Sequence, residues 1–275
     1  MAIAGLALLR GLLDAGGAAG AVVTGTAITS AGGLDWAATL IYFFASSSGL
    51  SRAFARRKRA IEREKLAKGA RRDLGQVAAN GGVATALAFA HALPWASRWR
   101  EPITAAFVAA LAAANADTWA TEIGTLSQRP PRLITSGRVV EPGASGGVSA
   151  LGLSATAAGA VSLSACFALS RRLVRRDGSR DGRWATFAAG AVGGVAGSLA
   201  DSVLGAAWQA VYRCPRCGGE TEQRVHRCGT ATERVRGLPW LDNDAVNALS
   251  TAAGALVGTA VWRLLRLPAQ LPCGD

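Results

Sequence analysis

The sequence has few charged residues: Asp, Glu, Lys and Arg make up 17% of its 275 residues, against roughly 25% in an average soluble domain. Whole stretches carry no charge at all. These are residues 15–34, 36–51, 74–97, 102–116, 145–169, 184–200 and 245–262. Crossing the hydrocarbon core of a bilayer takes about 20 mostly apolar residues. Several stretches reach that length directly, and others do so once one acidic residue is included, as with 102–124 and 184–212. This pattern favours a membrane protein over a soluble Ala- and Arg-rich helical protein.

The sequence also lacks the pattern of a cleavable signal peptide. Residues 2–13 are apolar but short, and Arg10 lies inside them rather than before them. We expect them to form an interfacial helix or a first span. The net charge of +12 would suggest a nucleic-acid partner in a soluble protein. In a membrane protein it is explained by basic loops that contact anionic lipid headgroups on the cytoplasmic side, so no nucleic-acid partner is expected.

The basic residues lie in the loops between the apolar stretches, which predicts an all-α fold. We expect one transmembrane helical domain over residues 1–275, a polytopic bundle of about six to seven helices. Segment 52–72 is strongly basic and should be cytoplasmic. Counting spans from there places residues 125–144 and the Cys/His loop, residues 213–240, on the same side. Loop 171–183, with six Arg and two Asp, departs from this rule because the count places it outside.

Four motifs put acids and amides inside or at the ends of the predicted spans. A charged side chain at the bilayer centre costs at least about 2.5–3.5 kcal/mol on insertion scales, so such residues face a polar interior and mark function. Helix capping is the alternative for Asp242 or Asn243, and Asp117 and Glu122 face one cavity only if their helix ends near Thr121. The motif residues are Gln76, Asn80, Asp117, Glu122, Asp201, Gln209, Asp242, Asn243, Asp244 and Asn247.

Carboxylates and amides are hard oxygen ligands that suit Mg²⁺, which takes one or two carboxylates plus substrate phosphates. We expect Asp117, Asp201 and Asp244 to be the metal ligands. A Gly-rich turn with Ser145, Gly146 and Gly147 leads into the next span. Ser145 could cap that helix, whose N-terminus would bind an anion. Arg132 and Arg138 are possible phosphate clamps. The alternative is that these glycines only allow close helix packing.

Four residues of the Cys/His loop follow the pattern C-x2-C-x8-H-x-C: Cys214, Cys217, His226 and Cys228. Thiolates and imidazole in this arrangement suit a closed tetrahedral Zn²⁺ site, and a cytosolic loop argues against a disulfide. The alternative is four unligated side chains. A bound zinc ion would fold the loop beside Asp242 and would have no catalytic role.

Taken in order, the motifs resemble an integral-membrane family that includes plant and cyanobacterial phytyl-phosphate kinase and animal transmembrane protein 19. The resemblance covers most of the chain. It lies in the motifs FFASSSGLSR (43–52), RRDLGQVAANGG (71–82), ADTWATEIG (116–124), PRLIT (131–135), PGASGGVS (142–149), GSLADSVLGAAWQ (197–209) and LDNDAVN (241–247).

The resemblance implies transfer of a phosphoryl group from a nucleoside triphosphate, with CTP favoured, to a prenyl monophosphate such as phytyl phosphate. We assign Mg²⁺ binding to the acids Asp117, Glu122, Asp201, Asp242 and Asp244, and phosphate binding to Arg132 and the glycine turn, from their chemistry rather than from the family. The site would face the cytoplasm from the cell membrane. The alternative is a transporter of a lipid phosphate or cation that uses the same acids.

Overall fold

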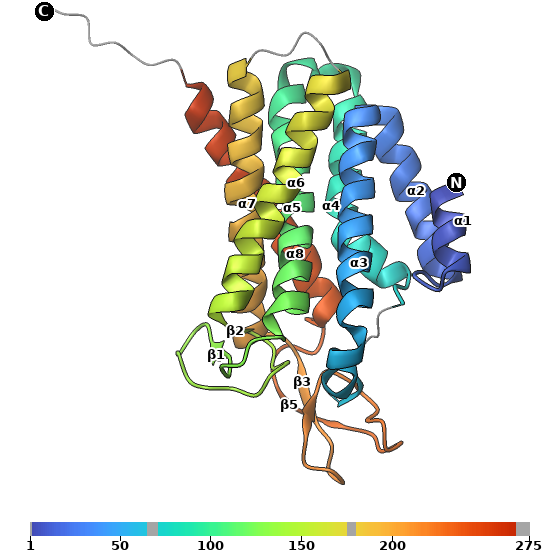
Figure 1. Cartoon of the computed structure of the whole chain (residues 1–275), viewed down its shortest axis with the longest axis vertical. Coiled ribbons are helices and arrows are strands. Elements are labelled where there is room, and N and C mark those ends of the chain that lie inside the picture. The colour runs from blue at the N-terminus through green and yellow to red at the C-terminus, as the bar shows by residue number, and fades with distance from the viewer. Residues whose placement is uncertain (1, 65–70, 175–179, 268–275) are drawn as a thin grey trace, which may run out of the picture.

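The computed structural model describes residues 2–64, 71–174 and 180–267, so residues 65–70 of the basic segment lie outside the described part. The described chain is built around long helices, as the charge-free stretches predicted (Figure 1). The helices are α1 (Ala2–Leu9), α2 (Ala15–Gly32), α3 (Leu34–Glu64), α4 (Leu74–Ala92), η1 (Pro94–Trp99), α5 (Arg100–Gly124), α6 (Ala150–Val174), α7 (Arg180–Ala207) and α8 (Asn243–Arg266).

Four helical segments are long and apolar enough to cross a membrane: Pro94–Gly124, Ala150–Val174, Gly182–Ala207 and Asn243–Arg266. The shorter or more polar helices α3 and α4 pack against them, and α2 packs against α3 and α4, so a total of six to seven crossings stays a prediction. With eight residues, α1 rises only about 12 Å at 1.5 Å per residue, which is too short for a span. A single span is thereby excluded for α1, and its place at the membrane interface stays a prediction.

The centre of the bundle is α5, which packs against α3, α4, α6, α7 and α8. Its residues 104–116 are buried throughout and are mostly alanine, so neighbouring helices approach closely. A Cβ added at Gly194 of α7 would lie 2.7 Å from the Ala112 Cβ atom. The small residues of α7 therefore allow the close packing of α5 and α7.

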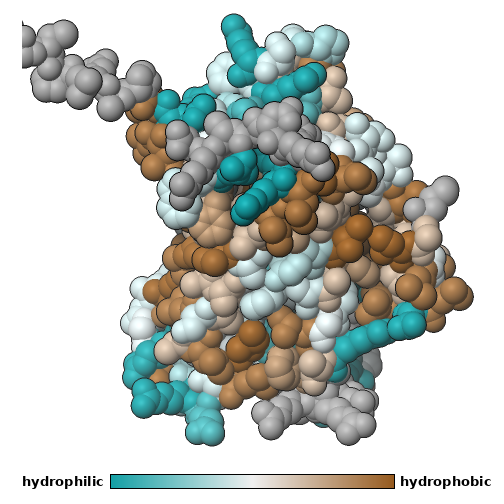
Figure 2. All heavy atoms as spheres, turned by 45° about the horizontal axis from the view of Figure 1, so that its top comes forward, coloured by the Kyte–Doolittle hydropathy of each residue, from teal (hydrophilic) through white to brown (hydrophobic). Residues whose placement is uncertain are grey.

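Large apolar side chains lie on the outer surface of the bundle. Leu153 and Val161 on α6, Val192 on α7, and Leu256 on α8 are all exposed. Figure 2 shows hydrophobic surface over the middle of the visible face, with hydrophilic residues gathered toward its ends. A surface of this kind suits contact with lipid chains rather than water.

The irregular segments gather at one end of the bundle, where α3 ends (Figure 1). A two-stranded antiparallel ribbon pairs β1 (Arg132–Leu133) with β2 (Gly147–Val148). A three-stranded sheet has the order β4 (Glu220–Thr221), β3 (Val211–Arg213), β5 (Glu233–Arg236). The Gly-rich turn and the Cys/His loop thus share one end of the bundle, as the topology count predicted.

Two predicted span limits are wrong. Residues 145–149 are not helical, because Gly147 and Val148 pair with β1 and the helix begins at Ala150. The span drawn as 184–212 ends as a helix at Ala207, and residues from Val211 enter the sheet. In both places the polar loop pairs with other loop segments at the end of the bundle instead of extending the helix.

The serine run of α3 lies at a helix interface. Ser46 Oγ donates to Asn115 Oδ1 (2.8 Å), and Ser51 Oγ donates to Glu122 Oε1 (2.8 Å). Asn115 also donates from Nδ2 to the Gly159 carbonyl of α6 (2.8 Å). Polar side chains in an apolar bundle are thereby paired across α3, α5 and α6, which stabilises their packing.

Candidate active site

Asp117 of α5 and Asp201 of α7 line one polar cavity at the loop end of the bundle, which we call the acidic cleft. The cavity has a volume of about 170 Å³. The α5–α7 packing brings these two acids together although 84 residues separate them in sequence (201 minus 117). The acidic cleft is further lined by Thr121, Arg129, Ser145, Gly146, Gly147, Gln209, Glu222 and Asn243. The predicted meeting of acids from distant motifs is therefore observed for this pair.

The Gly-rich turn closes one side of the acidic cleft. Gly146 has φ +79°, and a Cβ atom there would meet the backbone N of Ala206 on α7 at 2.5 Å. Only glycine fits both the positive φ and this close approach. Ser149, and not Ser145 as predicted, caps α6, because its Oγ accepts from the Gly152 N–H (3.1 Å).

Gln209 joins the Gly-rich turn to the Cys/His loop. Its side chain is 3% exposed. Ser145 Oγ donates to Gln209 Oε1 (2.5 Å), and Gln209 Nε2 donates to Glu222 Oε1 (2.9 Å). Glu222 thereby brings a third carboxylate to the acidic cleft.

A larger cavity of about 480 Å³ adjoins the acidic cleft, and we call it the outer chamber. Gln209, Glu222 and Asn243 line both cavities. The remaining wall of the outer chamber comes mainly from the Cys/His loop and the strand before it: Ala210, Tyr212, Gln223, Arg224, Val225 and Asp242. Its volume lies within the range of about 300–1,000 Å³ typical of small-molecule sites.

The residues of the acidic cleft fit a hard divalent cation. Three carboxylates, from Asp117, Asp201 and Glu222, line this one cavity. The Asp201 Oδ2 atom is buried and has no hydrogen-bond partner among the described residues. Mg²⁺ takes one or two carboxylates and completes its shell with water and substrate phosphates, which matches this open donor set.

Glu122 does not share the acidic cleft with Asp117. The helix continues past Thr121 to Gly124, so the two acids point to different sides of α5, as five residues of helix require. Glu122 is buried against α3, where it accepts from Ser51. The prediction that Glu122 belongs to the same site as Asp117 is therefore wrong.

Gln76 and Asn80 lie in a different cavity, the apolar groove formed by α1, α2, α3 and α4, whose volume is about 520 Å³. Gln76 completes a capping box with Asp73 at the start of α4, and Asn80 Nδ2 donates to the Gln76 carbonyl (3.0 Å). The prediction that they lie beside the acids is wrong. The capping geometry holds them on the α4 face directed toward α2 and α3.

Arg72, just before the start of α4, lines the apolar groove. Its guanidinium carbon is 5.6 Å from the Phe43 ring centroid and 5.8 Å from that of Phe44. Burial lowers the pKa of Arg72, and the nearby charge of Glu122 partly offsets this shift. The apolar groove therefore combines a long apolar wall with one poorly solvated cation.

Arg132 is exposed and donates from Nη1 to the Gly137 carbonyl of its own hairpin (2.8 Å). Arg129, which the sequence reasoning did not select, lines the acidic cleft instead. Glu222 and Arg224 were also missed. The sequence signal was weak in each case, because single charged residues in a polar loop are ordinarily solvent-exposed.

The residues of the LDNDAVN motif at the start of α8 have two roles: one caps the helix and another lines the cavities. Asp242 caps the helix, since its Oδ1 accepts from the Ala245 N–H (3.0 Å), so the capping alternative holds for it. Asn243 lines both cavities. Asp244 has a buried Oδ1 atom and Asn247 Nδ2 donates to the Asn243 carbonyl (2.8 Å). Neither Asp244 nor Asn247 lines the acidic cleft, so Asn243 takes the place expected for Asp244.

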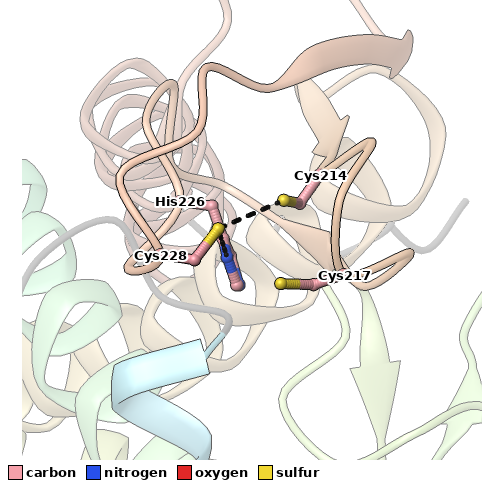
Figure 3. A group of neighbouring side chains, drawn as sticks. All are labelled: Cys214, Cys217, His226 and Cys228. Atoms are coloured by element: carbon pink, nitrogen blue, oxygen red, sulfur yellow. Dashed lines mark hydrogen bonds between the residues drawn. The ribbon is translucent and has the colours of Figure 1, made fainter.

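The four predicted ligands of the Cys/His loop lie together, as Figure 3 shows for Cys214, Cys217, His226 and Cys228. One ligand atom from each lies within 4.8 Å of the others. The C-x2-C-x8-H-x-C pattern thus correctly predicted which side chains meet.

The family model for the integral membrane protein family DUF92 matches residues 1–255. The chain belongs to this family. It is 31% identical over 247 residues to "Protein PGR" of Arabidopsis thaliana, covering 86% of this chain and 83% of that protein. It is 27% identical over 250 residues to the uncharacterized membrane protein MJ0933 of Methanocaldococcus jannaschii, covering 91% and 86%. No solved structure matches the chain.

Membership of the DUF92 family makes this an integral membrane protein and confirms the family resemblance that the motifs indicated. Together with the helical bundle, it confirms the predicted all-α polytopic membrane fold. In this DUF92 protein the matched region contains the acidic cleft, the outer chamber and the Cys/His loop.

Proposed function

We propose that this DUF92 protein transfers the terminal phosphoryl group of a nucleoside triphosphate, with CTP favoured, to a prenyl monophosphate such as phytyl phosphate. The observation that carries the proposal is the pairing of Asp117 and Asp201 in one cleft between a Gly-rich turn and a chamber of ligand size. Phosphoryl transfer depends mostly on positioning and on neutralising charge, and these elements supply both.

The residues around the two cavities suit a nucleotide and its phosphates. Tyr212 and Arg224 line the outer chamber, where an aromatic ring and a cation can contact a base and a phosphate. Arg129 and the backbone of the Gly-rich turn line the acidic cleft, where they can contact the phosphate that is transferred. Asp117 and Asp201 would hold Mg²⁺ beside those phosphates. When bound, that ion neutralises phosphate charge and orients the phosphoryl group.

The acceptor needs no separate general base. A phosphate monoester already carries a negatively charged oxygen that can attack the terminal phosphorus while the bond to the leaving nucleoside diphosphate breaks. The side chains then have to hold donor and acceptor in line and exclude water. Buried Gln209, fixed between Ser145 and Glu222, keeps the mouth of the acidic cleft in one arrangement.

We place the prenyl chain in the apolar groove, because most of the side chains that line it are apolar and its volume is about 520 Å³. Arg72 lines this groove, and its charge interacts with that of Glu122 in the last turns of α5, the helix that also carries Asp117. A photoreactive geranylgeranyl phosphate should label peptides from α2, α3 and α4. Labelling restricted to the outer faces of α6 and α8 would remove the apolar groove from the proposal.

The proposed site faces the cytoplasm from the cell membrane. The C-terminal end of α3, the Gly-rich turn and the Cys/His loop lie at the same end of the bundle. Basic loops remain on the cytoplasmic side during membrane insertion, which supports this orientation.

The test is a transfer assay on the full chain purified in detergent. With Mg²⁺, CTP labelled at its terminal phosphate and geranylgeranyl phosphate, labelled diphosphate should form, and chelation of Mg²⁺ should stop it. ATP, GTP and UTP in parallel reactions determine the nucleotide preference. Absence of labelled product with all four nucleotides and with both phytyl and geranylgeranyl phosphate would contradict the proposal. Uptake of a lipid phosphate into vesicles without nucleotide turnover would favour a transporter instead.

A further inference from the structure

The Cys/His loop contains a compact set of metal ligands outside the acidic cleft. The Cys228 Sγ atom lies 3.6 Å from Cys214 Sγ and 3.1 Å from His226 Nδ1. Cys217 completes the group from the opposite side (Figure 3). Two ligands come from the turn after β3 and two from the turn before β5.

The spacing fits a tetrahedral ion and not a disulfide. Zn–S bonds of about 2.3 Å place two sulfur ligands about 3.8 Å apart at the tetrahedral angle, close to the observed Cys214–Cys228 separation of 3.6 Å. Disulfide sulfurs lie about 2.05 Å apart. Three sulfurs and one imidazole nitrogen form a closed ligand set of the structural zinc type, with no position left for substrate.

The backbone builds each pair of ligands with a tight turn. The Gly218 N–H donates to the Cys214 carbonyl and the Gly229 N–H donates to the His226 carbonyl, both at 2.8 Å. Gly218 and Gly229 have φ values of +74° and +79°, which residues with side chains rarely adopt. The chain therefore places all four ligand atoms by two similar turns that face each other.

The loop buries few side chains of its own. Its strands are two to four residues long, and among its described residues the buried side chains include the ligands Cys214 and His226. Segments this small seldom bury enough apolar surface for stability, and a structural metal is one of the usual substitutes.

We propose that Cys214, Cys217, His226 and Cys228 bind one Zn²⁺ ion, which fixes the Cys/His loop as a wall of the outer chamber. Glu222 and Arg224 lie in the chain between the two ligand pairs, and both line the outer chamber. The ion thus determines where Glu222 meets Gln209 (2.9 Å). The zinc site itself stands whether or not the protein transfers phosphate.

Metal analysis of the full chain tests the site directly. Protein purified without chelators should contain one zinc ion per chain. Cys217→Ser removes an exposed ligand, so it changes no core packing, and it should weaken zinc binding about tenfold or more. Cys166→Ser, the same substitution within α6, is the matched control and should keep the zinc. Equal zinc content in the two variants, or no zinc in wild type even after its addition, would overturn the proposal. So would a Cys214–Cys228 disulfide in the purified protein.

Limited trypsin digestion tests the structural role. Arg216, Arg224 and Arg227 provide cleavage sites inside the loop. Stripping the zinc with a chelator should speed cleavage at these sites about tenfold or more, because the loop then opens more often. Cleavage should return to its original rate when zinc alone is restored. A cleavage rate that does not respond to zinc would overturn the role in fixing the loop, whatever the outcome of the transfer assay.

Discussion

The Gln209 side chain donates to the Glu222 carboxylate across 2.9 Å, while its own oxygen accepts from Ser145 at 2.5 Å. One buried amide thereby ties the Cys/His loop to the Gly-rich turn just beyond the end of α7. The two cavities meet at this residue. The helical bundle alone does not hold the Cys/His loop against the Gly-rich turn. The arrangement of the mouth of the acidic cleft therefore depends on the Gln209 bridge between them.

Replacing Gln209 with Leu should destabilise the protein. Leu has a similar size but leaves the Ser145 hydroxyl and the Glu222 carboxylate without this partner, a loss worth about 1–3 kcal/mol. Thermal unfolding in detergent measures the change. Gln128→Leu, at an exposed position, is the control and should stay within about 0.5 kcal/mol of wild type. Equal effects at the two positions would show that the bridge contributes nothing to stability.

Gly146→Ala should cost more stability than Gly137→Ala. Both glycines lie in the same loop with positive φ, +79° and +69°, so the conformational penalty of about 1 kcal/mol is shared. Only at Gly146 does the added Cβ meet Ala206, whereas Gly137 has open space. The clash should add about 1–3 kcal/mol. Unfolding temperatures of the two variants in the same detergent give the difference, and its absence would mean that the Gly-rich turn does not pack against α7.

Much of the fold could be predicted from the sequence, because the rule involved is local. A stretch without charge and of bilayer length forms a helix. That helix begins or ends where charged residues, Pro or a capping Asp appear, as at Asp73 and Asp242. The pairing of Cys214 with Cys217, and of His226 with Cys228, is also local, since each pair is separated by at most two residues.

The partners within the site could not be predicted in the same way. The side of α5 on which Glu122 lies depends on how far the helix continues and on Ser51 of α3. Glu222 reaches the acidic cleft only through Gln209, a contact between two loops whose residues carry no periodic signal. Gln76 looked like a site residue because it lies near Asn80, yet its side chain caps its own helix.

Zinc binding to the Cys/His loop should strengthen as pH rises. Hydrogen bonding to the Cys228 sulfur raises the pKa of Cys217 to about 11. The Thr230 hydroxyl and the His226 ring lower the pKa of Cys228 to about 5. Near pH 7 in the metal-free chain, Cys228 is therefore a thiolate and Cys217 still carries a proton. Zinc binds thiolates, so it must displace that proton. Its dissociation constant should fall about tenfold per pH unit for each proton released.

Chelator competition at pH 6.5 and 7.5 measures this dependence on the purified chain. Calorimetry in buffers of different protonation enthalpy counts the released protons independently. The same dissociation constant at both pH values, with no proton release, would contradict the assignment of Cys217 as a thiolate ligand.

The most direct test of the acidic cleft compares three carboxylate-to-amide variants in the transfer assay. Asp117→Asn and Asp201→Asn each remove one charge from the acidic cleft, and the rate of labelled diphosphate formation should fall about 100-fold or more. Glu101→Gln removes a carboxylate charge from the first turn of α5, at the other end of that helix, so its rate should stay within about twofold of wild type. Wild-type rates for Asp117→Asn or Asp201→Asn, or an equal loss in all three variants, would contradict a site built on these two aspartates.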